Sequence, residues 1–374
     1  MIECSVFYNH LTDRNIDFYT GVPDSLLKNI CSYISDHTSE DRHITAANEG
    51  GAIALASGHY LATGNPALVY MQNSGLGNSV NPLISLADPE VYGIPMLLLI
   101  GWRGMPNVKD EPQHVKQGKV TLGMLEVMGI PYRVLSKSDS EFCAIVDELL
   151  QESLSLRRPV ALVVEKGTFD DYSLQNIPDS SFSMSREEAV KLVANELGEE
   201  DIIVSTTGKC SRELYEYRDS VDGNHDRDFL TVGSMGHASL IAMGIALDKP
   251  SRLVICMDGD GAALMHLGAM STIGTSGLKN YKHIILNNGS HESVGGQPTA
   301  GYDVSFCEIA SGCGYKETWS VETYDELHKI MPKLKSCEGP VLLEIKVKNG
   351  SRADLGRPSI GPRENKERFM EHLR

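Results

Sequence analysis

The sequence predicts an α/β protein with two doubly wound domains, each built on a parallel sheet that helices cover on both faces. Three observations support this prediction. Short, continuous apolar runs such as residues 94–100 and 160–164 have the length of fully buried strands. Helical patterns separate these runs, as crossover connections do in parallel sheets. A chain of 374 residues is too long for one core and long enough for two.

In the first half, we expect strands at residues 17–20, 66–71, 94–100 and 160–164, with helices at 25–35, 49–63 and 78–87. The periodic pattern stops between Trp102 and Gly118, in a polar segment that directly follows a buried strand. Ligand sites of parallel sheets gather where strands end. Loops of this length are often functional, although a plain surface excursion gives the same pattern.

The second half repeats this rhythm after a polar, aperiodic stretch. We expect domains at residues 1–168 and 185–374, joined by a linker at 169–184, with no middle domain and no clear sequence repeat between the halves. Ser185 and Glu188 form a predicted capping box. Strands are expected at 201–205, 229–232, 253–257, 283–286 and 341–346, and helices from Ser211 and over 238–247 and 262–273.

The composition excludes several classes of function. A formal net charge of −16 argues against general binding of nucleic acid or of anionic membranes, but a few local basic residues still permit an anionic substrate. The sequence has no apolar run of the roughly 20 residues that span a bilayer. Its first residues also lack the basic start and apolar core of a signal peptide, so a cytoplasmic location is expected. The eight cysteines form no C-x-x-C pair, which disfavours zinc and redox motifs.

A metal and diphosphate site is predicted between residues 257 and 290. Glycines flank Asp260 where the strand 253–257 runs into a helix, a geometry that admits a phosphate and a hard cation. The helix returns the chain to the strand 283–286, which ends at Asn287 and Asn288. Because a right-handed crossover brings neighbouring strand ends to one sheet edge, Asp260 and an Asn can face one ion. Each motif alone also fits an ordinary turn.

These residues resemble the cofactor motif of thiamine diphosphate-dependent enzymes. The resemblance implies that Mg²⁺ is held by Asp260, by the side chain of Asn288 and by the backbone carbonyl of Ser290, a position where the family usually has Gly. It also implies cofactor contacts along the flanking segments. These contacts are expected at Thr207, Gly208, Gly233, Ser234, Met235, Gly236, Gly259, Gly261 and Ala262. Among them, Met235 would be the apolar wedge that bends the cofactor, and the Gly233 carbonyl would accept a hydrogen bond from its amine.

Glu49 is the expected activating acid. The segment from Ala46 to Ala52 resembles the family segment that carries a glutamate beside the cofactor's aminopyrimidine ring, at a strand-to-helix turn. Glu49 also suits the first turn of a helix for purely electrostatic reasons. In this superfamily the glutamate and the metal site of one active centre come from different subunits. The resemblance therefore implies a homo-oligomer, at least a dimer, with active sites at subunit interfaces.

Four further segments narrow the resemblance to the phosphonopyruvate decarboxylases and the related sulfopyruvate decarboxylases. They begin at Thr20, Gln72, Asp110 and Gly295, and the likeness covers nearly the whole chain. It implies that a small anionic 2-oxo acid, 3-phosphonopyruvate, loses CO₂ without oxidation and gives phosphonoacetaldehyde. Sulfopyruvate decarboxylation, a carboligase of the same superfamily and a non-catalytic relic are the alternatives.

Such a substrate requires an anion clamp and a proton donor. His114, on the predicted loop, is the leading donor because histidine titrates near neutral pH. Asp24 and Ser25 are plausible polar partners at a strand end, and His291 follows the metal loop. Arginine suits bidentate binding of a phosphonate, although a single Arg or Lys is more often a surface residue. The candidate clamps are Arg103 and Lys109 in the first domain, and Arg352 and Arg357 in the tail.

Overall fold

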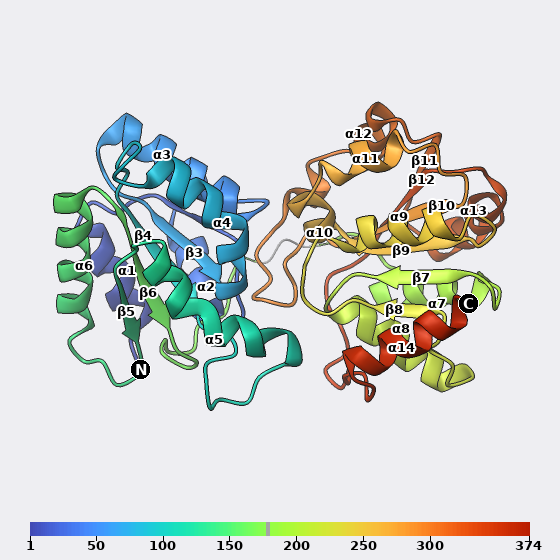
Figure 1. The fold of residues 1–374 in the computed structure, drawn as a ribbon, viewed down its shortest axis with the longest axis horizontal. Helices are drawn as coiled ribbons and strands as arrows, with labels where there is room; N and C mark the ends of the chain where they lie inside the picture. Colours follow the sequence, from blue (N-terminus) through green and yellow to red (C-terminus); the bar gives the residue numbers. More distant parts are fainter. Residues whose placement is uncertain (177–179) are drawn as a thin grey trace. The chain divides into compact units, whose positions relative to one another are not determined.

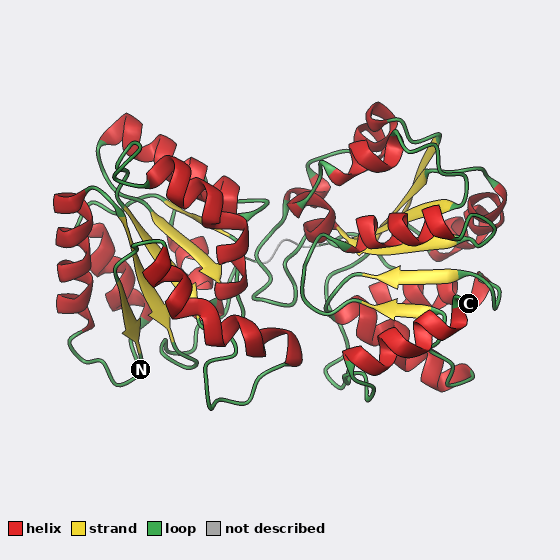
Figure 2. Cartoon of the chain, in the orientation of Figure 1, coloured by secondary structure: helices red, strands yellow, loops and turns green. Residues whose placement is uncertain are grey.

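The computed structural model describes residues 1–176 and 180–374. They form two compact units, the first from residues 1–176 with His291–Pro298, and the second from 180–290 with 299–374. Figure 1 labels their helices and strands, and Figure 2 shows strands in yellow between helices in red. The expected linker at 169–184 spans residues 177–179, which lie outside the described residues. The predicted domain boundaries stay a prediction.

The first unit contains a six-stranded, all-parallel sheet in the order β2-β1-β3-β4-β6-β5. Its strands are β1 (Tyr19–Gly21), β2 (His43–Thr45), β3 (Leu68–Gln72), β4 (Met96–Gly101), β5 (Tyr132–Leu135) and β6 (Pro159–Val164). Its helices are α1 (Cys4–Thr12), α2 (Lys28–His37), α3 (Glu49–Thr63), α4 (Leu76–Pro82), α5 (Pro112–Val127) and α6 (Phe142–Leu156), with short turns η1 (Asn73–Gly75) and η2 (Leu83–Ala87).

Alternating side chains of β4 show that this sheet is buried on both faces. Leu97 and Leu99 belong to a core with residues of α1, α2 and α6. Met96, Leu98 and Ile100 belong to a second core with residues of α3 and α5. A strand buried on both faces has no polar side to display, which explains its continuous apolar sequence.

The second unit has the strand order β11-β12-β10-β9-β7-β8, again all parallel. Its strands are β7 (Ile202–Ser205), β8 (Asp228–Leu230), β9 (Val254–Gly259), β10 (Tyr281–Asn287), β11 (Glu317–Val321) and β12 (Val341–Lys346). Its helices are α7 (Arg186–Glu196), α8 (Lys209–Val221), α9 (Ala238–Asp248), α10 (Asp260–Met265), α11 (Ala269–Gly274), α12 (Phe306–Cys313), α13 (Tyr324–Ser336) and α14 (Pro362–His372), with η3 (Ala300–Tyr302).

The two sheets share one topology. Numbered within its own unit, the first sheet reads 2-1-3-4-6-5, and the second reads the same from its β8 edge. The predicted fold class, two doubly wound parallel sheets without a middle domain, is therefore confirmed. The predicted capping box of Ser185 and Glu188 is also present at the start of α7.

Three local predictions were wrong. The expected helix over 262–273 is two short helices, because the chain leaves helical geometry at His266, whose ring packs against Gly236. The expected loop from Trp102 to Gly118 ends early, because α5 begins at Pro112, and proline is favoured at a first helical position. His114 therefore lies in a helix and not in a loop. The strand expected at 229–232 ends earlier, at Leu230.

Both ends of the expected linker pack on a unit. Phe169 forms a parallel bridge with Ile2, and the Asp170 carboxylate accepts a 2.8 Å hydrogen bond from the Cys4 amide. On the other side, Met184 is buried in the core beneath α7. Within residues 1–176 and 180–374, no helix has the length and apolar character that a membrane crossing needs.

Candidate functional site

The first unit gathers polar side chains where β1, β3 and β4 end. Asp24 is completely buried, and its carboxylate accepts hydrogen bonds from Gln72 Nε2 at 2.7 Å and from the Leu26 amide at 2.9 Å. A side chain at Gly101 would overlap this carboxylate, with a Cβ only 2.1 Å from Asp24 Oδ2. Burial raises the pKa of Asp24, and the two hydrogen bonds oppose this shift only in part.

Arg103 lies beside this carboxyl, held by Asp110. The Arg103 Nε donates to Asp110 Oδ2 at 2.8 Å, its Nη2 donates to Oδ1, and its Nη1 donates to Ser25 Oγ at 2.7 Å. Burial raises the pKa of Asp110, but the bonds from Arg103, Glu111 and Gly104 outweigh it and hold that pKa well below its usual value. Among the described residues, these bonds occupy three of the five guanidinium N–H donors. Two donors remain for an anion.

The other first-unit candidates are placed differently. His114 is buried, and burial and the neighbouring Arg103 charge lower its pKa. It therefore belongs to the Arg103 cluster. Lys109 is exposed on the adjoining loop. His291 opens the His291–Pro298 segment, which a 2.8 Å bond from the His291 amide to the Gln297 carbonyl closes, and burial lowers the pKa of His291 to about 4.

Glu49 is the first residue of α3, as expected, and only 5 % of it is exposed. The Asn48 side chain caps the helix by accepting from the Gly51 amide at 2.8 Å. Asn78 Nδ2 donates to Glu49 Oε2 at 2.7 Å. A Cβ on Gly75 would lie 2.6 Å from Glu49 Oε1, so the glycine makes room for the carboxylate.

The second unit brings Asp260 and Asn288 together. Asp260 begins α10 after β9, Asn288 follows β10, and these neighbouring strands pair Gly259 with Leu286. The Asp260 carboxylate accepts hydrogen bonds from the Thr299 hydroxyl and from the backbone N–H of Asn288. The Ser290 amide donates to Asn288 Oδ1 at 3.2 Å. The expected Asp260 carboxylate and Asn288 thus lie next to each other at one sheet edge, and Ser290 follows directly.

A buried hydrogen-bond network holds this loop. Asn287 Nδ2 donates to the Gly301 carbonyl at 2.7 Å and to Glu344 Oε1 at 2.8 Å, and its Oδ1 accepts from the Gly289 amide at 3.0 Å. A Cβ at Gly301 would lie 2.6 Å from Asp260 Oδ2. The first Asn of the pair is therefore structural, and the second, Asn288, is the one predicted to bind the metal.

These residues fit a hard cation and a diphosphate. Burial raises the pKa of Asp260 to about 6, although hydrogen bonds from Thr299 and from backbone amides oppose this shift. Carboxylate and amide oxygens are ligands that Mg²⁺ prefers. A Cβ on Gly259 would meet no atom within 4 Å, so packing within the described chain does not require a glycine there. Open space beside a cation ligand suits a phosphate.

The predicted cofactor cradle also assembles at this edge. The Gly233 amide donates to Thr207 Oγ1 at 3.1 Å, which joins the segments that follow β8 and β7. Gly208, Gly233, Ser234 and Gly236 all have positive φ angles, of 102°, 67°, 44° and 82°. Such backbone turns display amide and carbonyl groups instead of side chains. Met235, between them, is half-buried.

The tail arginines have other partners. Arg352 forms ion pairs with Glu187 at 2.8 Å, with Asp354 at 3.0 Å and with Glu216, and these contacts tie the tail to α7 and α8. Arg357 is exposed. The Arg352 side chain is 40 % exposed, against 17 % for Arg103, so Arg103 is the more shielded of the two and the better-prepared anion ligand.

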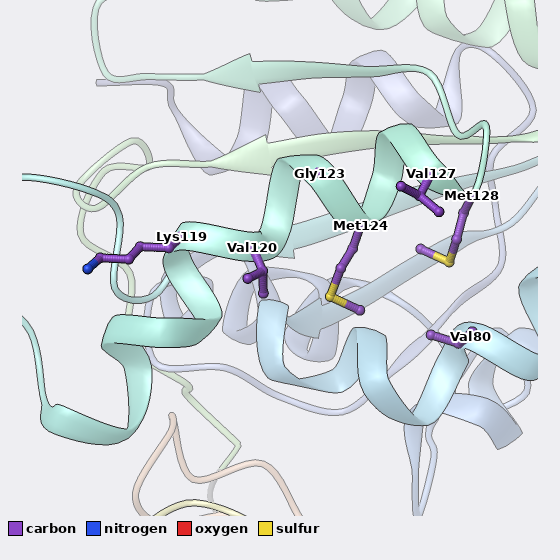
Figure 3. Close-up of a pocket in the computed structure, with 7 residues that line it drawn as sticks. All are labelled: Val80, Lys119, Val120, Gly123, Met124, Val127 and Met128. Atoms are coloured by element: carbon purple, nitrogen blue, oxygen red, sulfur yellow. The ribbon is translucent and has the colours of Figure 1, made fainter.

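An open hollow of about 520 Å³ in the first unit contains none of the predicted site residues. Figure 3 shows it between Val80 of α4 and the α5 residues Lys119, Val120, Met124 and Val127. Its lining is apolar except for Lys119. Val127 is 91 % exposed, and such an apolar surface is typical of a protein interface.

Several residues of the site were not assigned roles from the sequence. Asn78, Gln72 and Asp110 lie inside motifs that carried the family resemblance, but no spacing rule indicated their contacts. Thr299 likewise lay in a quoted motif. Glu344 gave one usable signal, since it is a charged residue in the middle of the apolar strand β12. A charge buried in a strand requires a polar partner.

Comparisons with known proteins agree with this geometry. Residues 5–123 match the family model described as the N-terminal TPP binding domain of thiamine pyrophosphate enzymes, and residues 206–345 match that of the C-terminal TPP binding domain. A phosphonopyruvate decarboxylase of Streptomyces hygroscopicus is 35 % identical, with 99 % of this chain and 94 % of that protein aligned. A sulfopyruvate decarboxylase of Methanosarcina acetivorans is 28 % identical, with 97 % and 95 % aligned.

Among solved structures, a putative thiamin diphosphate-dependent enzyme from Mycobacterium smegmatis is similar over 93 % of this chain and 99 % of that one. Its sequence is 15 % identical, and the TM-score is 0.40.

Proposed function

Since this chain belongs to the thiamine pyrophosphate enzymes, and within them to the family of the phosphonopyruvate decarboxylases, we propose that it decarboxylates 3-phosphonopyruvate to phosphonoacetaldehyde and CO₂. Thiamine diphosphate is the cofactor, and Mg²⁺ anchors its diphosphate. When bound, the cofactor would supply a carbon nucleophile for the 2-oxo group and an electron sink for decarboxylation. The observation that carries the proposal is the Arg103 fork, which Asp110 and Ser25 hold next to the buried Asp24 carboxyl.

Residues of both units have roles in the proposed reaction. Glu49 holds a proton at the ring nitrogen of the aminopyrimidine, and Asp260 and Asn288 hold the metal. Asp24 carries a proton for the carbon that loses CO₂, because its raised pKa keeps it protonated to higher pH than an ordinary carboxyl. Arg103 offers two N–H groups to the anionic head group.

An activity assay decides whether the substrate carries a phosphonate or a sulfonate head group. Initial rates of CO₂ release should be measured with 3-phosphonopyruvate and with sulfopyruvate at equal concentrations. We expect the higher kcat/KM with the phosphonate. A higher value with sulfopyruvate would assign the chain the sulfonate substrate instead.

Arg103→Met should lower kcat/KM for the anionic substrate on the order of 100-fold, because a desolvated charge pair contributes several kcal/mol. The loss for pyruvate, which lacks the second anion, should be much smaller. Lys166→Met removes an equal charge from an exposed position of the same unit and is the matched control. Equal losses for both substrates would show that Arg103 supports the fold and not the head group.

We also propose that the apolar face of α4 and α5 is covered by a second copy of this chain. The turn η1, whose Gly75 touches the Glu49 carboxylate, leads directly into α4. A subunit packed on α4 therefore lies near Glu49. In this family the metal half of each active centre comes from the partner subunit, so the occupant is a second copy.

Val127→Asp tests this face. Because Val127 is 91 % exposed, the substitution should leave the melting temperature of each unit nearly unchanged. We expect sedimentation velocity to show a shift from dimer to monomer at micromolar concentration, with activity falling in parallel. Val221→Asp, at a 62 % exposed valine of α8, is the control. A Val127→Asp protein that stays dimeric and active would exclude α5 from the interface.

A further inference from the structure

We infer that the buried side chains of Tyr315, His283 and Asp258 form a contact chain, with hydrogen bonds at its two ends and a 3.7 Å imidazole–carboxylate contact between them, that positions the metal-binding turn at Gly259 and Asp260. The inference rests on the proposed role of Asp260 as a metal ligand, and it adds positioning residues that do not touch the ion. Asp258 and His283 are 0 % and 1 % exposed, so neither group can exchange its contacts with water.

The sheet places these groups on one face. Asp258 and Cys256 are two residues apart on β9, and His283 of β10 is the register partner of Cys256. The side-chain atoms of the three residues lie within 4.8 Å of one another. Cys256 packs in the apolar core beneath α9 and α11. Polar groups in such a layer are costly unless they satisfy one another.

The contacts form a line that ends at the metal turn. Tyr315 Oη lies 3.2 Å from His283 Nδ1. His283 Nε2 lies 3.7 Å from Asp258 Oδ2, and neither atom has a hydrogen-bond partner elsewhere in the described residues. Asp258 Oδ1 accepts from the Gly259 amide at 3.0 Å. His283 Nε2 and Asp258 Oδ2 are therefore the polar atoms available to each other.

One placement of protons gives each of these atoms a neighbour of matching polarity. The Tyr315 hydroxyl donates to His283 Nδ1, so the ring proton sits on Nε2 and points at the Asp258 carboxylate. With the opposite tautomer, an Nε2 lone pair would face a carboxylate oxygen, and both would stay unpaired in a buried layer. The chain thus runs from Tyr315 through His283 and Asp258 to the Gly259 amide.

Cysteine, histidine and carboxylate are also zinc ligands, so a metal ion is the competing occupant. Burial raises the pKa of the Cys256 thiol well above its usual value, and the group forms a hydrogen bond with Tyr281. A structural zinc site takes four protein ligands, and within the described residues three such groups converge here. The contact chain accounts for the cluster without an ion.

The contact chain affects the metal site because it fixes Gly259, the residue directly before Asp260. If the Gly259 amide loses its acceptor, the turn and the Asp260 carboxylate can reorient. Groups that orient metal ligands from behind typically change metal affinity 10–100-fold when they are replaced.

The test measures the dissociation constant of Mn²⁺, a paramagnetic substitute for Mg²⁺, by electron paramagnetic resonance with thiamine diphosphate present. We expect His283→Leu to weaken binding at least about 10-fold. His283→Gln should recover part of this loss, because its amide N–H₂ can donate to Asp258. Tyr315→Phe, which removes a single hydroxyl, should weaken Mn²⁺ binding severalfold. This variant provides the test if His283→Leu does not fold.

Tyr281→Phe is the matched control. Tyr281 is also fully buried on β10, and its hydroxyl donates to the Ser239 carbonyl at 3.1 Å and contacts Cys256, neither of which belongs to the contact chain. It should lose similar heat stability yet bind Mn²⁺ within twofold of the unmodified protein. Nitrogen NMR of the histidine rings should also show His283 protonated at Nε2.

Three results would overturn the inference: equal Mn²⁺ affinity in Tyr315→Phe and Tyr281→Phe, a His283 ring protonated at Nδ1, or one bound zinc per chain that is lost in Cys256→Ala. Failure of the proposed function looks different. In that case 3-phosphonopyruvate is not turned over while the predicted affinity differences persist. If the unmodified protein binds no Mn²⁺, both the metal site and this inference fail.

Discussion

Glu49→Gln should bind thiamine diphosphate and Mg²⁺ within severalfold of the unmodified protein, yet decarboxylate 3-phosphonopyruvate on the order of 10²–10⁴-fold more slowly. The amide keeps the size of the carboxyl group and can keep the contact with Asn78. It cannot hold a transferable proton at the aminopyrimidine nitrogen. The loss should therefore appear in kcat, while KM stays nearly constant.

Isothermal titration with the cofactor and steady-state CO₂ release measure the two halves of this prediction. Glu90→Gln, which neutralises an exposed carboxylate of the same unit, is the control and should match the unmodified protein. An active Glu49→Gln protein would refute the proposed role. A variant that loses cofactor binding and activity together would indicate that Glu49 acts mainly in packing.

Asp260→Asn should abolish the stabilisation that Mg²⁺ and thiamine diphosphate give together. A ligand that binds only the folded state adds about 2.7 kcal/mol to the free energy of unfolding at 100 times its dissociation constant. This gain requires the ionised Asp260 carboxylate, because a neutral amide binds Mg²⁺ weakly. We expect heat denaturation of Asp260→Asn to give the same melting temperature with and without the ligands.

Asp303→Asn, at an exposed position shortly after Thr299, is the matched control, and it should retain the full shift in melting temperature. An undiminished shift in Asp260→Asn would remove Asp260 from the metal site. A smaller shift that returns at high Mg²⁺ would instead make it one of several contributing ligands.

The sequence predicted the central strands of both sheets but missed most of their edges. The continuous apolar runs of β4, β6 and β12 reveal strands that are buried on both faces. The edge strands β2, β5 and β11 were not predicted, because they are partly exposed and lack such runs. At β8, the remaining edge, only the boundary was misplaced.

The residues of the candidate site were likewise predicted only in part. Asp260 and Asn288 could be placed on one sheet edge because topology brings neighbouring strand ends together. The partners of Arg103 could not be predicted in this way, because Ser25 and Asp110 reach Arg103 through side-chain rotamers that no spacing rule specifies. The position of His114 was misjudged for a local reason. The start of a helix at Pro112 was hidden by the polar residues before it.

The most direct test of this account is CO₂ release from 3-phosphonopyruvate by the purified protein, with thiamine diphosphate and Mg²⁺ supplied together and withheld one at a time. We predict phosphonoacetaldehyde and CO₂ in equal amounts when both are present, and no turnover of chelator-treated protein when either is absent. Turnover without thiamine diphosphate, or no turnover with both present, would contradict the account.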